Sequence, residues 1–174
     1  SNVSGFESIL TMNTGAEAVE TAIKAARRWG YFSKGIHEDK AEIIVANGNF
    51  HGRTTTIVSF SSDASYKDGF GPFTPGFNSA EYCGSCDCQS VDSCLSIESF
   101  EKKINKNTCA ILVEPIQGEA GIRVPTDGWL KQLRALCTSR NILLILDEIQ
   151  SGLGRTGKLF AYEHENIKPD GLIL

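Results

Sequence analysis

Short hydrophobic runs alternate with amphipathic stretches along this chain. Five runs rich in apolar and β-branched residues are strand candidates: Glu42–Ala46, 56–60, 109–113, 142–146 and 171–174. Runs that are apolar throughout, rather than at every second position, are typical of strands covered on both faces in a parallel sheet. The pattern therefore predicts an α/β fold, a mostly parallel sheet flanked by helices.

Two helices are predicted from apolar residues at helical spacing. Residues 129–140 carry one apolar stripe and lie between the third and fourth strand candidates, where they predict a right-handed crossover helix. A second helix begins near Thr14, because Thr14 and Glu17 have the spacing of a capping box. Residues 61–89 are rich in Ser, Gly, Pro and Cys and are predicted to be loop.

Composition narrows the class of protein. A chain of 174 residues with 41% apolar content can bury the core of one globular domain, and no domain boundary interrupts it. The net charge of −4, without basic clusters among aromatics, argues against a nucleic-acid partner. No apolar run approaches the roughly 20 residues that cross a bilayer, which argues against a membrane partner. Six cysteines are too few for a secreted disulfide scaffold, so a reducing compartment is expected.

The first candidate for chemistry is residues 13–17, Asn-Thr-Gly-Ala-Glu, at the start of a predicted helix. A helix N-terminus leaves backbone N–H groups free to bind an anion. The spacing G-x-G-x-x-G of a dinucleotide site is absent, so the anion would be a single phosphate. The alternative is an ordinary helix start that binds nothing.

The second candidate is Asp147, which ends the apolar run 142–146. Open α/β sheets place their ligands at the carboxyl ends of their strands. A carboxylate buried there needs a cation or several donors, because its desolvation costs on the order of several kcal/mol. A protonated pyridine nitrogen would meet that need. The alternatives are a cap of the next turn or a magnesium ligand.

Two loops after predicted strands add further candidates. Phe50 offers a flat face for stacking, and Arg53 offers a planar fork that matches a carboxylate, whereas His51 is expected to make a structural hydrogen bond. The second loop, 114–121, places acidic side chains and two glycines at a strand end. Alone, each loop is equally consistent with a solvated surface turn.

Taken together, these segments resemble the class III, fold-type I aminotransferases, which use pyridoxal 5′-phosphate (PLP). The resemblance spans nearly the whole chain except 78–93 and is carried by five blocks in the family's order: 12–21, 49–54, 70–73, 114–121 and 147–157. It implies that residues 1–174 form part of the PLP-binding large domain of a homodimer. It also implies that the N-terminal segment, the small domain and the lysine that carries the cofactor lie outside these residues.

The resemblance also implies roles for single residues in binding the cofactor. The backbone of Gly15 and Ala16 would hold the phosphate and Phe50 would stack on the ring. Asp147 would be the catalytic partner of the pyridinium, and Gln150 would contact the ring's phenolic oxygen.

For the substrates, the resemblance implies amino-acid and 2-oxo-acid partners. Arg53 would take the substrate α-carboxylate, Glu119 would act as a gate opened by an arginine outside these residues, and Glu114 is a weaker candidate for the same pocket. Members that move the terminal amino group of ornithine to 2-oxoglutarate match best, and members that use acetylornithine are the alternative. The expected location is cytoplasmic, with the mitochondrial matrix as the alternative.

One segment, about residues 78–94, departs from the family and is rich in cysteine. Four thiols there could bind zinc, form a redox-sensitive pair or stay inert: Cys83, Cys86, Cys88 and Cys94. A truncated, non-catalytic binding module that uses this loop is therefore a rival to the enzyme.

Overall fold

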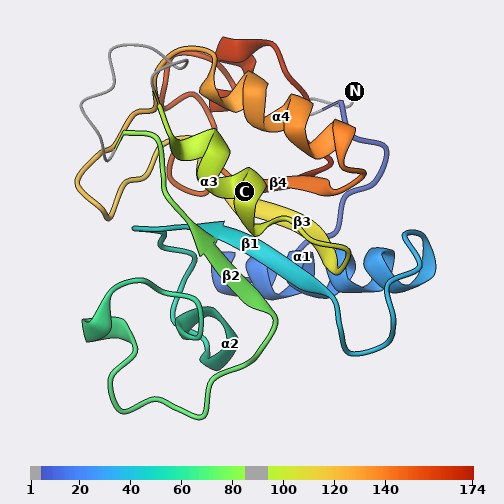
Figure 1. The fold of residues 1–174 in the computed structure, drawn as a ribbon. Helices are drawn as coiled ribbons and strands as arrows, with labels where there is room; N and C mark the ends of the chain where they lie inside the picture. The colour runs from blue at the N-terminus through green and yellow to red at the C-terminus, as the bar shows by residue number, and fades with distance from the viewer. Residues whose placement is uncertain (1–4, 85–93) are drawn as a thin grey trace.

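The computed structural model describes residues 5–84 and 94–174, and its centre is a sheet of five parallel strands (Figure 1). The strand order is β2-β1-β3-β4-β5, and every neighbouring pair is parallel. The strands are β1 Glu42–Ala46, β2 Phe77–Ala80, β3 Thr108–Val113, β4 Leu143–Asp147 and β5 Gly171–Ile173. This arrangement confirms the predicted α/β fold with a parallel sheet.

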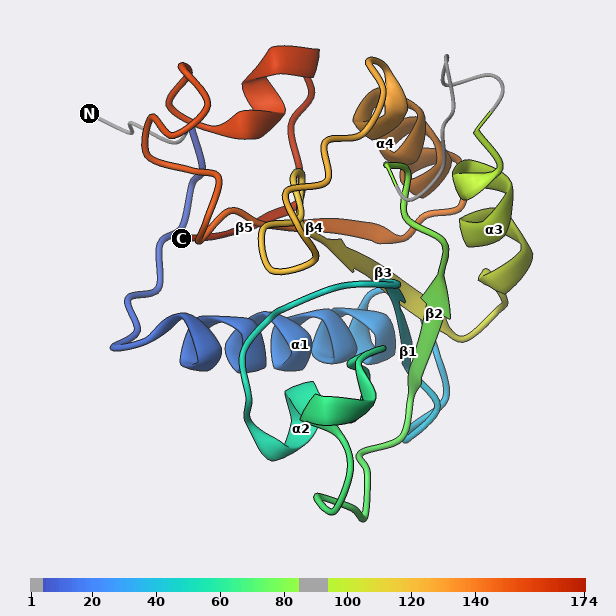
Figure 2. The same ribbon diagram turned by 90° about the vertical axis from the view of Figure 1, so that its left-hand side faces the viewer.

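Helices cover both faces of the sheet (Figure 2). On one face lie α1 Gly15–Phe32 and the short α2 Thr55–Val58; on the other lie α3 Ser96–Lys103 and α4 Trp129–Ser139, followed by the 3-10 turn η3 Ala161–Glu165. The chain moves from β1 to β2 in one direction across the sheet and from β3 to β4 in the opposite direction. Connections between parallel strands are right-handed, so the segments that make these two connections must cover opposite faces of the sheet.

The order of the strands also fixes where a ligand can enter. β1 and β3 are neighbours, but the connections that leave their carboxyl ends run to opposite sides of the sheet. Such a switch point opens a crevice outside the carboxyl ends of the two strands. The loops that begin at Asn47 and Glu114 therefore face one another across this crevice.

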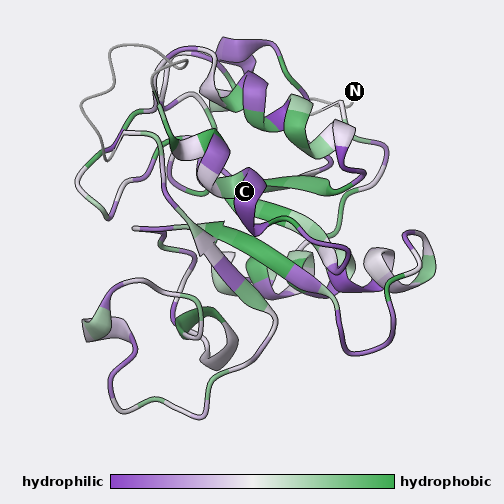
Figure 3. Ribbon diagram, viewed as in Figure 1, coloured by the Kyte–Doolittle hydropathy of each residue, from purple (hydrophilic) through white to green (hydrophobic). Residues whose placement is uncertain are grey.

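The inner strands β1, β3 and β4 are mostly apolar (Figure 3), because nearly all of their residues are buried. All six residues of β3 are buried. One side of the sheet packs against α1 through Val19, Ile23 and Ala26. The other packs against α3 and α4, where the fully buried Trp129 donates a 3.0 Å hydrogen bond from its indole N–H to Ser96 Oγ. The predicted helix 129–140 and the capping box of Thr14 are both confirmed.

Two predictions about local structure are wrong. Residues 56–60 were expected to form a strand, but α2 is helical because Thr54 Oγ1 accepts a hydrogen bond from the Ile57 N–H and starts a turn. Its β-branched residues favour strands only weakly when no neighbouring strand is available. Residues 61–89 are predicted to be loop throughout, yet they contain the edge strand β2 and the 3-10 turn η1 Ala64–Tyr66. In addition, the helix α3 was not predicted.

Across residues 5–84 and 94–174, no helix combines the length and apolar character needed to span a bilayer.

Candidate functional site

A cavity of about 220 Å³ lies at the carboxyl ends of β1, β3 and β4, against the N-terminus of α1. Nine residues line it: Gly15, Ala16, Phe50, His51, Gly52, Glu114, Asp147, Ile149 and Gln150. Six of them are the predicted cofactor and substrate residues Gly15, Ala16, Phe50, Glu114, Asp147 and Gln150. The fold therefore gathers four separate sequence segments around one space.

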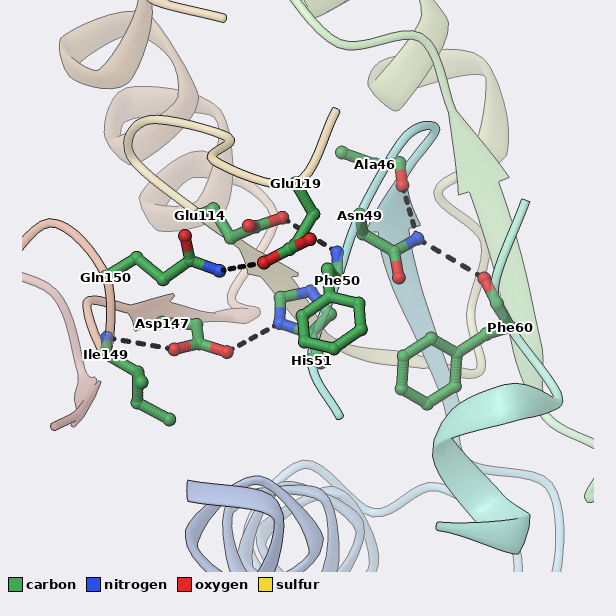
Figure 4. Close-up of polar contacts among 10 residues, drawn as sticks. All are labelled: Ala46, Asn49, Phe50, His51, Phe60, Glu114, Glu119, Asp147, Ile149 and Gln150. Carbon is green, nitrogen blue, oxygen red and sulfur yellow. Dashed lines mark hydrogen bonds and ion pairs between the residues drawn. The ribbon is translucent and has the colours of Figure 1, made fainter. Parts of the chain in front are cut away.

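Asp147 lies at the end of β4 and is only 5% exposed (Figure 4). One carboxylate oxygen is 2.7 Å from His51 Nδ1, and the other accepts a 3.1 Å hydrogen bond from the Ile149 N–H. An ionised carboxylate can only accept hydrogen bonds, so we assign the proton of the first contact to His51 Nδ1. The carboxylate is thus buried, oriented on two sides and still borders the cavity.

His51 extends from the loop after β1 and is 3% exposed. Its Nε2 atom is buried and has no hydrogen-bond partner in the part of the chain that the structure describes. The expected structural hydrogen bond of His51 is present, and its partner is the predicted catalytic residue Asp147. His51 is therefore a positioning residue for that carboxylate.

Glu114 follows β3 and is 4% exposed. Its Oε2 accepts a 3.1 Å hydrogen bond from the Phe50 N–H, which ties the loop after β3 to the loop after β1. Burial raises the pKa of Glu114 from 4.5 to about 7, while His51 and the Phe50 N–H oppose that rise. A carboxyl group that changes charge near neutral pH therefore sits at the wall of the cavity.

The N-terminus of α1 presents free donors to the cavity. The capping box satisfies the N–H of Asn13 and Thr14, which donate to Glu17 Oε2 at 2.8 and 3.1 Å, and the N–H of Glu17, which donates to Thr14 Oγ1. Among the described residues, the next two N–H groups, those of Gly15 and Ala16, have no acceptor. Two unsatisfied donors at a helix N-terminus form an anion site.

Two glycines allow the segments around the cavity to approach one another. A Cβ atom on Gly15 would meet the tip of the Ile149 side chain, which would have to move to make room for it. Gly52 adopts φ of 116°, and a Cβ there would lie 3.2 Å from that of Ala16. The loop after β1 therefore packs directly against the first turn of α1.

Gln150 and Glu119 meet at the open side of the cavity. Gln150 Nε2 lies 3.4 Å from Glu119 Oε1, a long hydrogen bond (Figure 4). The Gln150 side chain also lies next to Gly118. Both side chains are exposed, and among the described residues Glu119 forms no ion pair. Glu119 does not itself line the cavity but contacts a residue that does.

Arg53 lies beside the cavity rather than in its wall. Its guanidinium carbon is 5.6 Å from the centre of the Phe50 ring and 5.3 Å from that of Tyr66. The group is exposed and forms no ion pair with any described residue. A cation that is held in place by rings and has no counterion is available to an anionic ligand.

The predicted cysteine cluster is only partly within the described residues. Cys83 and Cys94 are buried and form no disulfide with a described residue, and Cys83 Sγ lies 3.1 Å from Thr126 Oγ1. Burial raises the pKa of Cys94, and the neighbouring Cys83 adds to that rise. Cys86 and Cys88 fall outside the described residues, so the zinc and redox interpretations remain predictions.

Two contributions to the site were not predicted: Ile149 supplies a backbone donor to Asp147, and Tyr66 stacks on Arg53. A structural hydrogen bond of His51 was predicted, but its partner Asp147 was not. The partner of His51 could have been found by noting that His51 and Asp147 both follow parallel strands. Tyr66 gives no such signal, because it lies in a loop with no periodic pattern.

Comparison with known proteins agrees with this geometry. The family model described as Aminotransferase class-III matches residues 1–174. The chain is 56% identical over 172 residues to ornithine aminotransferase 2 of Staphylococcus saprophyticus, covering 99% of this chain and 40% of that protein. The chain thus spans about two fifths of the length of this curated relative.

Solved structures give the same picture. The ornithine aminotransferase of Toxoplasma gondii matches with a TM-score of 0.86 and 46% identity, over 97% of this chain and 38% of that one. A second structure of that protein, crystallized in the presence of oxidized glutathione, shows partial occupancy of PLP at its active site. Acetylornithine aminotransferase from Elizabethkingia anophelis matches with a TM-score of 0.74 and 51% identity, over 97% of this chain and 38% of that one.

Proposed function

Because the chain belongs to the class-III aminotransferase family, we propose that it forms part of the large domain of a PLP-dependent ornithine aminotransferase. The reaction would move the terminal amino group of L-ornithine to 2-oxoglutarate, giving glutamate semialdehyde and glutamate. One observation carries the proposal: the buried Asp147 carboxylate and the free N–H groups of Gly15 and Ala16 border the same cavity.

The residues of the cavity fit PLP. A phosphate needs several donors, and the first turn of α1 offers two that are unsatisfied. A pyridinium nitrogen needs an anion that is itself held in place, and Asp147 is fixed by His51 and the Ile149 N–H. When bound, PLP supplies a protonated ring that draws electrons from the substrate carbon.

Each side chain then has a definite task. Asp147 would accept a hydrogen bond from the pyridine nitrogen of bound PLP and keep that proton on the ring. His51 keeps the Asp147 carboxylate in position by its 2.7 Å contact. Phe50 would cover one face of the ring, and Gln150 would donate its amide N–H to the phenolic oxygen.

The substrate residues lie on the outer side of that cavity. Arg53 binds the substrate α-carboxylate, since its guanidinium is exposed and has no carboxylate partner within residues 5–84 and 94–174. Glu119 serves as the gate, paired with or released by an arginine outside these residues. Glu114 borders the same space and supports it through its bond to the Phe50 N–H.

Three further assignments belong to the same proposal. The active unit is a homodimer, the location is cytoplasmic with the mitochondrial matrix as the alternative, and the lysine that carries the cofactor lies outside residues 1–174. Among residues 5–84 and 94–174, no lysine lines the cavity. Acetylornithine is the second candidate substrate, favoured by the 51% identity to the Elizabethkingia anophelis structure.

The test is a substrate comparison on the full-length gene product purified with PLP. Turnover with 2-oxoglutarate is measured for L-ornithine and for N-acetylornithine, and glutamate formation is followed in both. We expect ornithine to give the higher kcat/KM. A preference for acetylornithine would reassign the substrate, and turnover of neither would overturn the proposed activity.

A further inference from the structure

Arg53 belongs to a cluster of three side chains that comes from two separate segments. The rings of Phe50 and Tyr66 meet edge to face with centroids 5.7 Å apart. The Arg53 guanidinium lies over both rings, at 5.6 Å from Phe50 and 5.3 Å from Tyr66. The cluster thus links Phe50, which borders the Asp147 cavity, to Arg53, which lies outside it.

Tyr66 is held in this cluster by its own turn. It ends the 3-10 turn η1, where its N–H donates to the Asp63 carbonyl at 3.2 Å. The Asp63 carboxylate accepts hydrogen bonds from Ser65 N and Oγ at 2.8 and 2.7 Å, which caps the turn. The Tyr66 ring is therefore presented by a locally fixed backbone, and the longer Arg53 side chain rests on it.

The rings hold the cation without neutralising it. In an arginine that is paired with a carboxylate, the N–H donors of the guanidinium are already occupied. A guanidinium that stacks on aromatic faces keeps the N–H groups at the edge of its plane available to a ligand. Arg53 also borders a second cavity of about 370 Å³ with Tyr66 and Phe70. The guanidinium is therefore bordered by open space as well as by the two rings.

We infer that Tyr66 is a positioning residue that orients Arg53 toward the carboxylate of the substrate and so favours amino-acid and 2-oxo-acid substrates over plain amines. This inference rests on the proposed function, in which Arg53 binds the α-carboxylate. Tyr66 acts through its ring, and its hydroxyl group is not required.

The test compares two variants of Tyr66 in the full-length gene product with PLP bound. Tyr66→Leu removes the ring, and Tyr66→Phe keeps it. Phe73→Leu is the matched control, because Phe73 lies in the same loop but its ring contacts Lys67 instead of Arg53. KM and kcat are measured for ornithine and 2-oxoglutarate, and kcat/KM for 1,4-diaminobutane, a diamine without a carboxylate.

We expect Tyr66→Leu to raise both KM values about fivefold, the upper end of the effect expected when one exposed cation–π contact is lost. Its kcat and its kcat/KM for the diamine should stay within about twofold of wild type, which a general loss of structure would not allow. Tyr66→Phe and Phe73→Leu should resemble wild type. Unchanged KM values for Tyr66→Leu, an equal loss with the diamine, or the same effect from Phe73→Leu would overturn the inference.

A binding measurement separates this inference from the proposed function. Glutarate is a dicarboxylate that cannot exchange an amino group, so its Kd, measured by calorimetry, does not depend on turnover. We expect Tyr66→Leu to weaken glutarate binding about fivefold. If wild type fails to use ornithine but still binds glutarate in a Tyr66-dependent way, only the proposed reaction is wrong. If the Kd is the same in wild type and Tyr66→Leu, or wild type does not bind glutarate, the inference is wrong.

Discussion

Glu114 offers the sharpest test of the electrostatics of the site, through the substitution Glu114→Gln. The carboxyl group is 4% exposed, and burial raises its pKa from 4.5 to about 7. Glutamine has nearly the same shape and still offers an oxygen to the Phe50 N–H, which donates to Glu114 at 3.1 Å. The substitution therefore removes the ionisation and little else.

The raised pKa of Glu114 decides whether the protein gains or loses stability as the pH rises. Between pH 4.5 and about 7 the folded protein keeps a proton on Glu114 that the unfolded chain has lost. The free energy of unfolding therefore falls across this window as pH rises, by about 1.4 kcal/mol per pH unit. The stability contributed by the protonated group is fully present below pH 4.5, and about 3 kcal/mol of it is lost above pH 7.

The assay is urea unfolding of wild type and Glu114→Gln at about pH 5 and about pH 8, within the range of the linkage relation. We expect nearly equal stability at the lower pH and a variant that is more stable by about 3 kcal/mol at the higher pH. Glu38→Gln is the control, because Glu38 is exposed and its substitution should leave the pH dependence unchanged. An infrared carbonyl band that titrates near neutral pH in wild type and is absent from Glu114→Gln would identify the group directly.

The reasoning is refuted if wild type and Glu114→Gln lose stability in parallel between the two pH values. That result would mean that the surroundings in the folded protein compensate ionised Glu114 fully. A variant that is less stable at both pH values would show that the glutamine does not keep the bond to Phe50.

Three other predictions concern the same molecule. Asp147→Ala should lower kcat of the full-length gene product by orders of magnitude, because the ring loses its anionic partner; near-normal transamination would refute the role. Arg53→Lys should raise KM for ornithine and 2-oxoglutarate while PLP stays bound, since a point charge cannot replace a planar fork; unchanged kinetics would exclude Arg53 from substrate binding. If the thiols of residues 83–94 bind zinc, elemental analysis should give about one equivalent per chain, and four freely titratable thiols without metal would exclude the site.

The sequence was sufficient for most of the sheet because burial on both faces leaves a strong pattern. β3 and β4 are almost wholly apolar, and their ends were predicted to within one residue. The start of α1 was equally clear, since the capping box of Thr14 and Glu17 is a local interaction that the sequence alone specifies. Cofactor and substrate roles came from the resemblance of five blocks to a known family, and the structure brings most of those residues to one cavity.

Interactions between distant segments were decided only by the tertiary structure. The edge strand β2 has a weak pattern of its own and is a strand because β1 pairs with it. The contact of His51 with Asp147 joins residues 96 positions apart, and its partners could be matched only after the order of the strands was known. Tyr66 was invisible in the sequence for the same reason: a ring in an irregular loop acquires a role only when folding places a guanidinium over it. Local signals were enough for the buried strands and for the start of α1, whereas the edge strand, burial, pKa and the choice of partner depend on which segments the fold brings together.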